Sequence, residues 1–389
     1  MDLKDSPAER EFRDGLRSWL SENLPKGWNT PEWKEREDQV AFLKEWTANL
    51  HEAGYSGLAW PKEYGGAGAP VSFQAIAYEE LARAEAPEHV GLIGIGMAGP
   101  TIIAAGTEEQ KSKYLAKLLS GEEIWCQGFS EPGSGSDLAS LQTRAVPDGD
   151  GYRITGQKVW SSFAHFADRC ILLARTDPEA PKHKGITFFL LDMHADGVET
   201  RPLRQITGEA EFNEIFLDDV FVPGEDIVGE VGNGWQVAIT TLMFERGSST
   251  FLLIGYLDSA FRGLVKLARE TPRNGGLAVD DPRVRDRIAR AHADIQALRF
   301  TNHRALSTLM KTGIPGPEGS IAKLHWSETH QRLRHLALEI LGPEAALDQG
   351  PQSWQIRQLR TRGNTIEAGT SEILRNIVAE RVLGLPKSR

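Results

Sequence analysis

The stretch Trp125-Cys-Gln-Gly-Phe-Ser-Glu-Pro-Gly-Ser-Gly-Ser-Asp-Leu138 marks the point where the sequence changes character. A short apolar run, typical of a strand end, is followed by Ser130-Glu-Pro132 and then by a turn of small residues, Gly133 to Ser136. Two glycines and two serines carry little bulk, so the backbone of this turn can approach a ligand closely and point N–H donors at negative charge. The same composition also suits a solvent-exposed turn between two strands, and the stretch alone does not separate these interpretations.

The apolar periodicity differs on the two sides of this stretch. Residues 1–121 predict helices, because apolar side chains repeat at helical spacing and the capping-box pattern Ser6-Pro-Ala-Glu9 precedes the first of them. Residues 122–231 contain short β-rich runs separated by turn residues, which is typical of a small antiparallel barrel or sandwich. Residues 232–389 return to helix, and the apolar seam from Val284 to Leu298 indicates a bundle. We therefore expect an α+β, mainly helical chain with three domains at these boundaries.

Composition narrows the class of protein. The 389 residues carry a net charge of −10, which argues against nucleic acid or an anionic membrane surface as a partner. No apolar run reaches the roughly 18 residues that a membrane span needs, and the first residues lack the basic and apolar regions of a secretory signal. Two cysteines fit a reducing compartment, so we expect a cytoplasmic protein. The histidines and cysteines show no metal-ligand spacing, so no metal site is expected.

Four further segments accompany the opening stretch: Ala59-Trp-Pro-Lys-Glu-Tyr-Gly-Gly66, Gly156-Gln-Lys-Val-Trp160, Asn213-Glu-Ile-Phe-Leu-Asp-Asp-Val-Phe-Val-Pro223 and Thr365-Ile-Glu-Ala-Gly-Thr-Ser-Glu-Ile-Leu-Arg-Asn-Ile-Val-Ala-Glu-Arg381. Together the five segments resemble the acyl-CoA dehydrogenase family, in its bacterial branch, and stand in the family's order almost from end to end. The resemblance implies a helical N-terminal domain, a middle β-barrel and a C-terminal four-helix bundle.

The resemblance also implies a reaction. Family members remove a proton from the α-carbon of an acyl-CoA thioester and a hydride from its β-carbon, and FAD accepts the hydride. The product is a trans-2-enoyl-CoA, and the electrons pass to an electron-transfer flavoprotein. Because the α-proton is only weakly acidic, the site must supply a positioned base and stabilise a developing enolate oxygen.

Several cofactor-binding positions of the family correspond to residues of this chain. By resemblance, the residues around the flavin ring are Gln127, Phe129, Ser130, Trp160 and Ser162. Gly135 and Ser136 correspond to positions near the pyrophosphate, with Ser136 also near the substrate. Further cofactor contacts correspond to Thr370 and Glu372, while Glu339 and Gly342 resemble a segment that reaches the cofactor of a neighbouring subunit. Without the motif, an ordinary aromatic of the barrel core is the simpler interpretation of Trp160.

The catalytic base departs from the best-known pattern. Many family members carry the catalytic glutamate directly before Gly-Thr, where this chain has Ala368, with Glu367 one residue earlier. Other members place it on the first bundle helix, directly before an arginine, as in Glu245-Arg246 here. We expect Glu245 to be the base, with Glu367 as the alternative and a surface ion pair as the non-catalytic interpretation of Glu245.

Two other positions follow from the resemblance. The thioester oxygen is held in the family by a backbone N–H at the position of Ala368, and a backbone donor does not depend on the side chain. Arg246 resembles a position that contacts the CoA moiety of the substrate.

Some residues differ from the family pattern and leave a second interpretation open. The family usually has glutamine at Glu339 and glycine at Pro343, and residues 269–276 replace a segment that grips the FAD diphosphate, where Arg273 is a possible substitute. These departures, together with Ala368, suit a non-catalytic subunit of a hetero-oligomer. A flavin oxidase or monooxygenase on the same scaffold is a third interpretation. We expect an oligomer, a dimer or a homotetramer, because Glu339 and Gly342 suit cofactor contact only across subunits.

Overall fold

The computed structural model describes residues 4–28, 38–87, 89–245, 250–312, 316–347, 350 and 353–387, with the backbone alone for Glu245. The chain divides into two compact units. The bundle unit comprises Met1–Glu37, Ala69–Pro87 and Arg246–Arg389, and the sheet unit comprises Asp38–Gly68 and Glu88–Glu245. Each unit thus contains segments that are far apart in the sequence.

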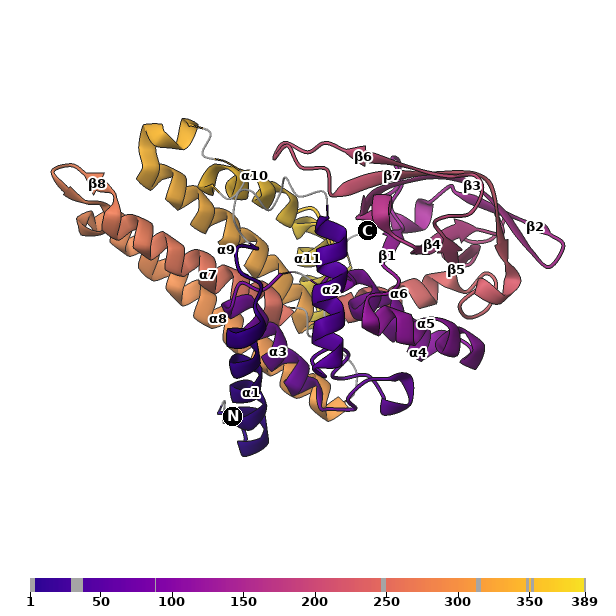
Figure 1. Cartoon of the computed structure of the whole chain (residues 1–389). Helices are drawn as coiled ribbons and strands as arrows, with labels where there is room; N and C mark the ends of the chain where they lie inside the picture. The colour runs from indigo at the N-terminus through magenta and orange to yellow at the C-terminus, as the bar shows by residue number, and fades with distance from the viewer. Residues whose placement is uncertain are drawn as a thin grey trace. The chain divides into compact units, whose positions relative to one another are not determined.

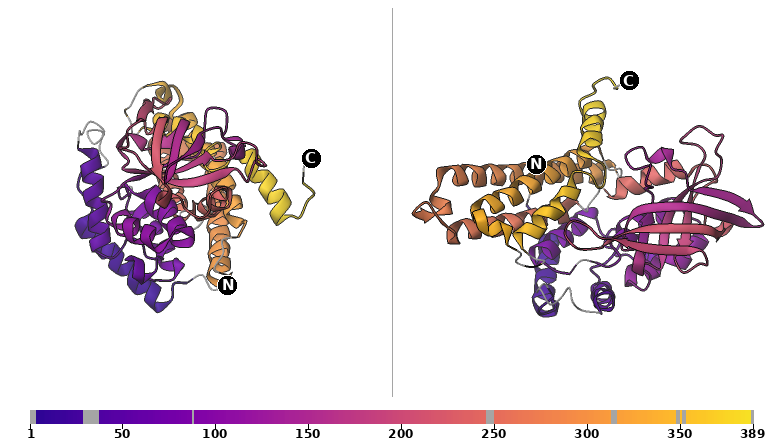
Figure 2. Two further views of the ribbon diagram at one scale, coloured as in Figure 1. Left: turned by 90° about the vertical axis from the view of Figure 1, so that its right-hand side faces the viewer. Right: turned by 90° about the horizontal axis from the view of Figure 1, so that it is seen from above.

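The bundle unit is helical. Its helices are α1 (Pro7–Asn23), α3 (Val71–Arg83), α7 (Thr250–Glu270), α8 (Pro282–Thr312), α9 (Glu318–Leu341), α10 (Trp354–Asn364) and α11 (Ser371–Ile377). The long helices α7, α8 and α9 run side by side, with α10 against α9 (Figures 1 and 2). The predicted seam forms part of their core, because Val284, Ile295 and Leu298 are buried there. The predicted capping box is also present, with Glu9 N–H donating to Ser6 Oγ.

The sheet unit contains the expected β structure. Its strands are β1 (Trp125–Gly128), β2 (Arg144–Asp148), β3 (Gly151–Ser162), β4 (Arg169–Arg175), β5 (Ile186–Asp192), β6 (Val198–Leu203) and β7 (Phe212–Pro223). They form a curled sheet in the order β1-β4-β2-β3-β7-β6, with β5 on the other edge of β4 (Figure 1). Most neighbours are antiparallel, as expected, but β1 and β2 run parallel to β4. Strand β3 runs opposite to β2, and the chain reverses again before β4. Strand β4 therefore runs in the same direction as β1 and β2.

Helices cover one face of this sheet. They are α4 (Gly99–Ala105), α5 (Glu108–Ser120) and α6 (Gly234–Glu245), while α2 (Gln39–Glu52) packs on α5. Side chains of β4 alternate between the two faces: Ile171 and Leu173 meet the helices, whereas Cys170 and Leu172 point into the curl of the sheet. No described helix has the length and apolar character that crossing a membrane requires.

A π-helical turn, Gly94–Ala98, leads into α4. An added Cβ at Gly94 would lie 2.4 Å from Leu118, and one at Gly99 would lie 2.1 Å from Trp60, so both glycines permit close packing. At Gly96, by contrast, an added Cβ would meet no atom of the described residues within 4 Å. The glycine-rich run is thus a largely buried helical segment with one open position.

His89 makes the stability of the sheet unit depend on pH. Burial, with a smaller contribution from His51, lowers the pKa of His89 to about 3, and its Nδ1 accepts the Gly91 N–H at 3.0 Å. The unfolded chain takes up a proton below a pKa of about 6.5 that the folded chain does not, so stability is lost as the pH falls below that value. Because the side chain is only partly enclosed, we expect a loss of about 1–2 kcal/mol between pH 7.5 and 5.

Urea unfolding at the two pH values measures this loss. His89→Asn keeps an acceptor for the Gly91 N–H but does not titrate, so it should abolish this part of the pH dependence. An unchanged dependence in the variant would assign the effect to other groups.

Candidate functional site

The turn after β1 is a tight hairpin with an open side. Glu131 and Ser134 exchange backbone hydrogen bonds of 2.8 and 3.0 Å, and Ser134 Oγ donates to Asp137 O at 3.0 Å. Within the part of the chain that the structure describes, an added Cβ at Gly133 or Gly135 would meet nothing within 4 Å. Internal hydrogen bonds therefore hold the shape of the turn. Gly135 and Ser136 are exposed, so a ligand can reach the backbone there.

The residues before this turn differ in how far they are buried. Phe129 is buried and packs edge-on against Phe188, with ring centroids 5.9 Å apart. A contact between Phe129 and a flavin would therefore come from its backbone. Gln127 and Ser130 are half-buried, and Ser130 O accepts the Val159 N–H at 2.9 Å.

Trp160 is not a core aromatic. Between the pairs Lys158–Ile215 and Ser161–Asn213, strand β3 has one residue more than β7, which is a β-bulge. Trp160 adopts φ 62° there, and it is 60 % exposed. A bulky residue at positive φ is strained, and such strain persists where the surrounding structure enforces it. The bulge thus presents the indole outward, as a residue that covers a ligand requires, and Ser162 follows it, paired with Phe212.

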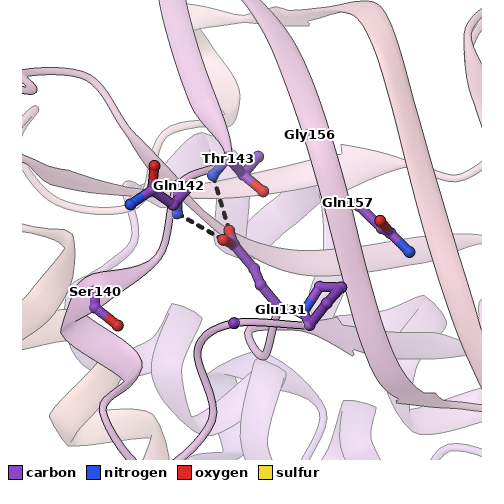
Figure 3. A pocket seen from close by; sticks show the side chains of 8 residues that line it. Glu131, Ser140, Gln142, Thr143, Gly156 and Gln157 are labelled. Carbon is purple, nitrogen blue, oxygen red and sulfur yellow. Dashed lines mark hydrogen bonds between the residues drawn. The ribbon is translucent and has the colours of Figure 1, made fainter.

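A buried ion pair lies beneath the hairpin. Lys158 is fully buried, and its Nζ lies 2.8 Å from Glu131 Oε1. The Glu131 carboxylate also accepts the N–H groups of Gln142, at 2.6 Å, and Thr143, at 2.9 Å (Figure 3). A cavity of about 500 Å³ adjoins these residues. Glu131 and Lys158 both stand within the motifs quoted above, but the sequence gives no sign that they pair, because 27 positions separate them.

Burial acts on both members of the pair. Burial raises the pKa of the Glu131 carboxyl, but the Lys158 charge and the hydrogen bonds outweigh it, and the net shift is downward. Burial lowers the pKa of Lys158, and the attraction of Glu131 offsets this only in part.

In the bundle unit, the turn between α10 and α11 has a strained backbone that a buried lysine supports through hydrogen bonds. Ala368 has φ 51°, a left-handed conformation that is uncommon outside glycine. The buried Lys323 on α9 donates to Asn364 O at 2.8 Å and to Gly369 O at 2.9 Å. This ammonium ties the two ends of the turn together and so fixes the backbone around Ala368.

The other predicted residues of this turn have local partners. Glu367 forms an ion pair with Arg360 at 3.1 Å and accepts the Asn364 amide at 2.7 Å. Thr370 caps α11 by accepting the Ile373 N–H, and Glu372 is exposed. A carboxylate that already holds two donors is less suited to proton abstraction than one aimed at a substrate.

Glu339 and Gly342 lie at the end of α9. The Glu339 carboxylate is engaged by Arg287 and by His335, and Gly342 ends the helix with φ 59°. Arg273 donates to Glu339 O at 3.1 Å and pairs with Asp281 at 3.1 Å. The three side chains Glu339, Arg273 and Arg287 thus hold the end of α9 together.

The preferred base is placed only by its backbone. Glu245 is the last residue of α6, and Arg246 lies outside the described residues. Within the sheet unit, the structure brings together the segments 127–136 and 158–162. The residues 339–342 and 367–372 belong to the bundle unit, and a single site formed from both sets stays a prediction.

Comparison with known proteins identifies the family. Three family models match in succession: "Acyl-CoA dehydrogenase, N-terminal domain" at residues 6–122, the middle domain at 126–220 and the C-terminal domain at 232–383. The chain is 42% identical to "Acyl-CoA dehydrogenase IpdE1" of Mycobacterium tuberculosis over 97% of its own length and 98% of the relative's.

Two solved structures extend this similarity. One, described as "Tcur3481-Tcur3483 steroid ACAD", shares 35% identity over all of both chains with a TM-score of 0.86. The other, the ChsE4-ChsE5 complex from Mycobacterium tuberculosis, shares 32% identity over all of both chains with a TM-score of 0.85. With three consecutive domain models matched and a relative 42% identical over nearly its whole length, the chain belongs to the acyl-CoA dehydrogenase family, whose members are FAD-dependent oxidoreductases acting on CH–CH bonds.

Proposed function

We propose that this chain converts an acyl-CoA thioester to the trans-2-enoyl-CoA and passes the electrons to an electron-transfer flavoprotein. The observation that carries the proposal is the exposed Trp160, which the β-bulge holds at positive φ in the segment hydrogen-bonded to Ser130. Strain at an exposed indole beside an open small-residue turn suits ligand contact better than core packing.

The residues of the sheet unit fit FAD. Gly135 and Ser136 are exposed on the open side of the hairpin, and a pyrophosphate is the kind of anion that backbone N–H donors of such a turn bind. Bound FAD supplies the hydride acceptor. Trp160 would cover the flavin and exclude water from it.

The remaining chemistry falls to side chains and backbone of this chain. Glu245 would take the α-proton from the substrate. The Ala368 N–H would donate to the thioester oxygen as negative charge develops there. Arg246 would contact the CoA moiety, with Ser136 also on the substrate side. The positive φ of Ala368 supports this role for its N–H group, since strained non-glycine residues cluster at ligand sites.

The similarity to a steroid ACAD supports a bulky, polycyclic acyl group as substrate. Gly96 supports the same proposal, because a Cβ added there would meet none of the residues that the structure describes within 4 Å, in an otherwise tightly packed helical turn. We accordingly expect a ring-bearing acyl-CoA to be a better substrate than a straight-chain one.

A hetero-oligomer is the second candidate for the assembly, in place of a cytoplasmic homotetramer. The similarity to the ChsE4-ChsE5 complex favours it. So does Glu339, whose carboxylate is held by Arg287 and His335 and is therefore less free for a neighbour's cofactor.

The visible spectrum of the purified protein tests the proposal. We expect a yellow protein with about one FAD per chain that acyl-CoA bleaches under anaerobic conditions, followed by electron transfer to an added electron-transfer flavoprotein. A panel of straight-chain and polycyclic acyl-CoAs measures the substrate preference. FAD binding only after mixing with a second chain would favour the hetero-oligomer. A protein that stays colourless with FAD, alone and with candidate partner chains, would contradict the enzyme assignment.

A further inference from the structure

Three hydrogen-bonded contacts join the end of β1 to the middle of β3. Lys158 Nζ donates to Phe129 O at 3.3 Å and to Glu131 Oε1 at 2.8 Å. Between these two bonds, the Val159 N–H donates to Ser130 O at 2.9 Å. Three consecutive residues, 129–131, are thus held by two consecutive residues, 158 and 159, and Trp160 follows directly.

Two glycines permit close packing around these contacts. An added Cβ at Gly128 would lie 2.9 Å from Cys170 Sγ and 3.0 Å from Leu172 Cδ1, so β1 packs closely on β4, and Lys158 Cγ lies in ordinary contact at 3.5 Å. An added Cβ at Gly156 would lie 2.5 Å from Thr143 Oγ1. The segment 142–143, whose N–H groups hold the Glu131 carboxylate, therefore packs tightly on β3 (Figure 3).

We propose that Lys158 and Glu131 are a positioning pair, which fixes the strained Trp160 and the open hairpin relative to each other so that both meet one FAD. The inference rests on the proposed function, because it assigns these two elements to the flavin and its pyrophosphate. A contribution to folding stability does not by itself explain why the chain has this pair, since replacing both members of a buried ion pair with neutral groups is often tolerated. Geometry is the stronger reason, because the pair joins two ligand-facing segments that are distant in the sequence.

The test compares the FAD affinity of a charge-free pair with that of a control. In Glu131→Gln/Lys158→Met no buried charge is left without its partner. The control is Asp226→Asn, which alters another buried carboxylate of the sheet unit, bonded to Lys113 at 3.1 Å and to the Tyr114 hydroxyl at 2.6 Å. Both variants should lose thermal stability, but only the first should change how FAD is held.

We expect the double variant to raise the Kd for FAD at least about tenfold and to alter the visible circular dichroism of the bound flavin, both measured well below its melting temperature. Trp160→Ala should weaken FAD binding as well. If the pair acts through Trp160, the losses should be less than additive when all three substitutions are combined. The Asp226→Asn control should keep the parental Kd and spectrum.

A folded double variant with the parental Kd and flavin spectrum would overturn the inference. Glu131→Gln/Lys158→Gln, which also leaves no buried charge without its partner and keeps a polar group at both positions, serves if the first double variant does not fold, and a parental Kd there would count equally against the inference. Unfolding of both would assign the pair to stability and also overturn the inference. If the parent and Asp226→Asn themselves bind no FAD, with or without a partner chain, the proposed function fails, and the positioning role fails with it.

Discussion

Glu245→Gln is expected to bind FAD and acyl-CoA as the parent does, yet to reduce the flavin at least about 10²–10⁴-fold more slowly. The α-proton of a thioester leaves only if a base is positioned to take it, and glutamine has the shape of glutamate without its basicity. Glu245 ends α6, the first helix after the sheet. Stopped-flow reduction under anaerobic conditions measures the rate, and the unchanged yellow colour shows that the cofactor is retained.

Glu367→Gln is the matched control. We expect it to stay within about tenfold of the parental rate, or about 1.4 kcal/mol on the barrier. The Glu367 carboxylate is already held by Arg360 and Asn364, so its loss should disturb the turn more than the chemistry. An inactive Glu367→Gln beside an active Glu245→Gln would assign the base to the C-terminal motif instead.

Lys323→Met should destabilise the bundle unit by several kcal/mol and slow flavin reduction by at least about tenfold. The ammonium of Lys323 is the donor to the carbonyls of Asn364 and Gly369, and a buried carbonyl left without a partner costs about 1–3 kcal/mol. Without this tie, the strained backbone at Ala368 is expected to relax, and the N–H that we propose as the donor to the thioester oxygen would be displaced.

Urea unfolding and single-turnover flavin reduction measure the two effects. Lys266→Met removes an exposed lysine from α7 of the same unit and should change neither. Parental stability together with a parental rate in Lys323→Met would show that the turn does not depend on this side chain.

The sequence alone determined the type of the main helices and strands and the family, although not the short hairpin of Pro272–Arg273 with Gly276–Leu277. Apolar periodicity correctly predicted the helices, the strands and the buried seam from Val284 to Leu298, because the repeat of a pattern follows from the local geometry of helix or strand. The capping box at Ser6 could equally be predicted, since a cap involves only residues within one turn.

The tertiary structure decided what local patterns cannot encode. The parallel pairing of β1 with β4, the bulge that exposes Trp160 and the burial of Lys158 against Glu131 each depend on residues that are distant in the sequence. The same holds for Lys323, which reaches a turn more than 40 residues away. Motif letters could name Trp160 and Ala368 as candidates, but only long-range hydrogen bonds and packing hold both at positive φ, because neither conformation is favourable in an isolated chain.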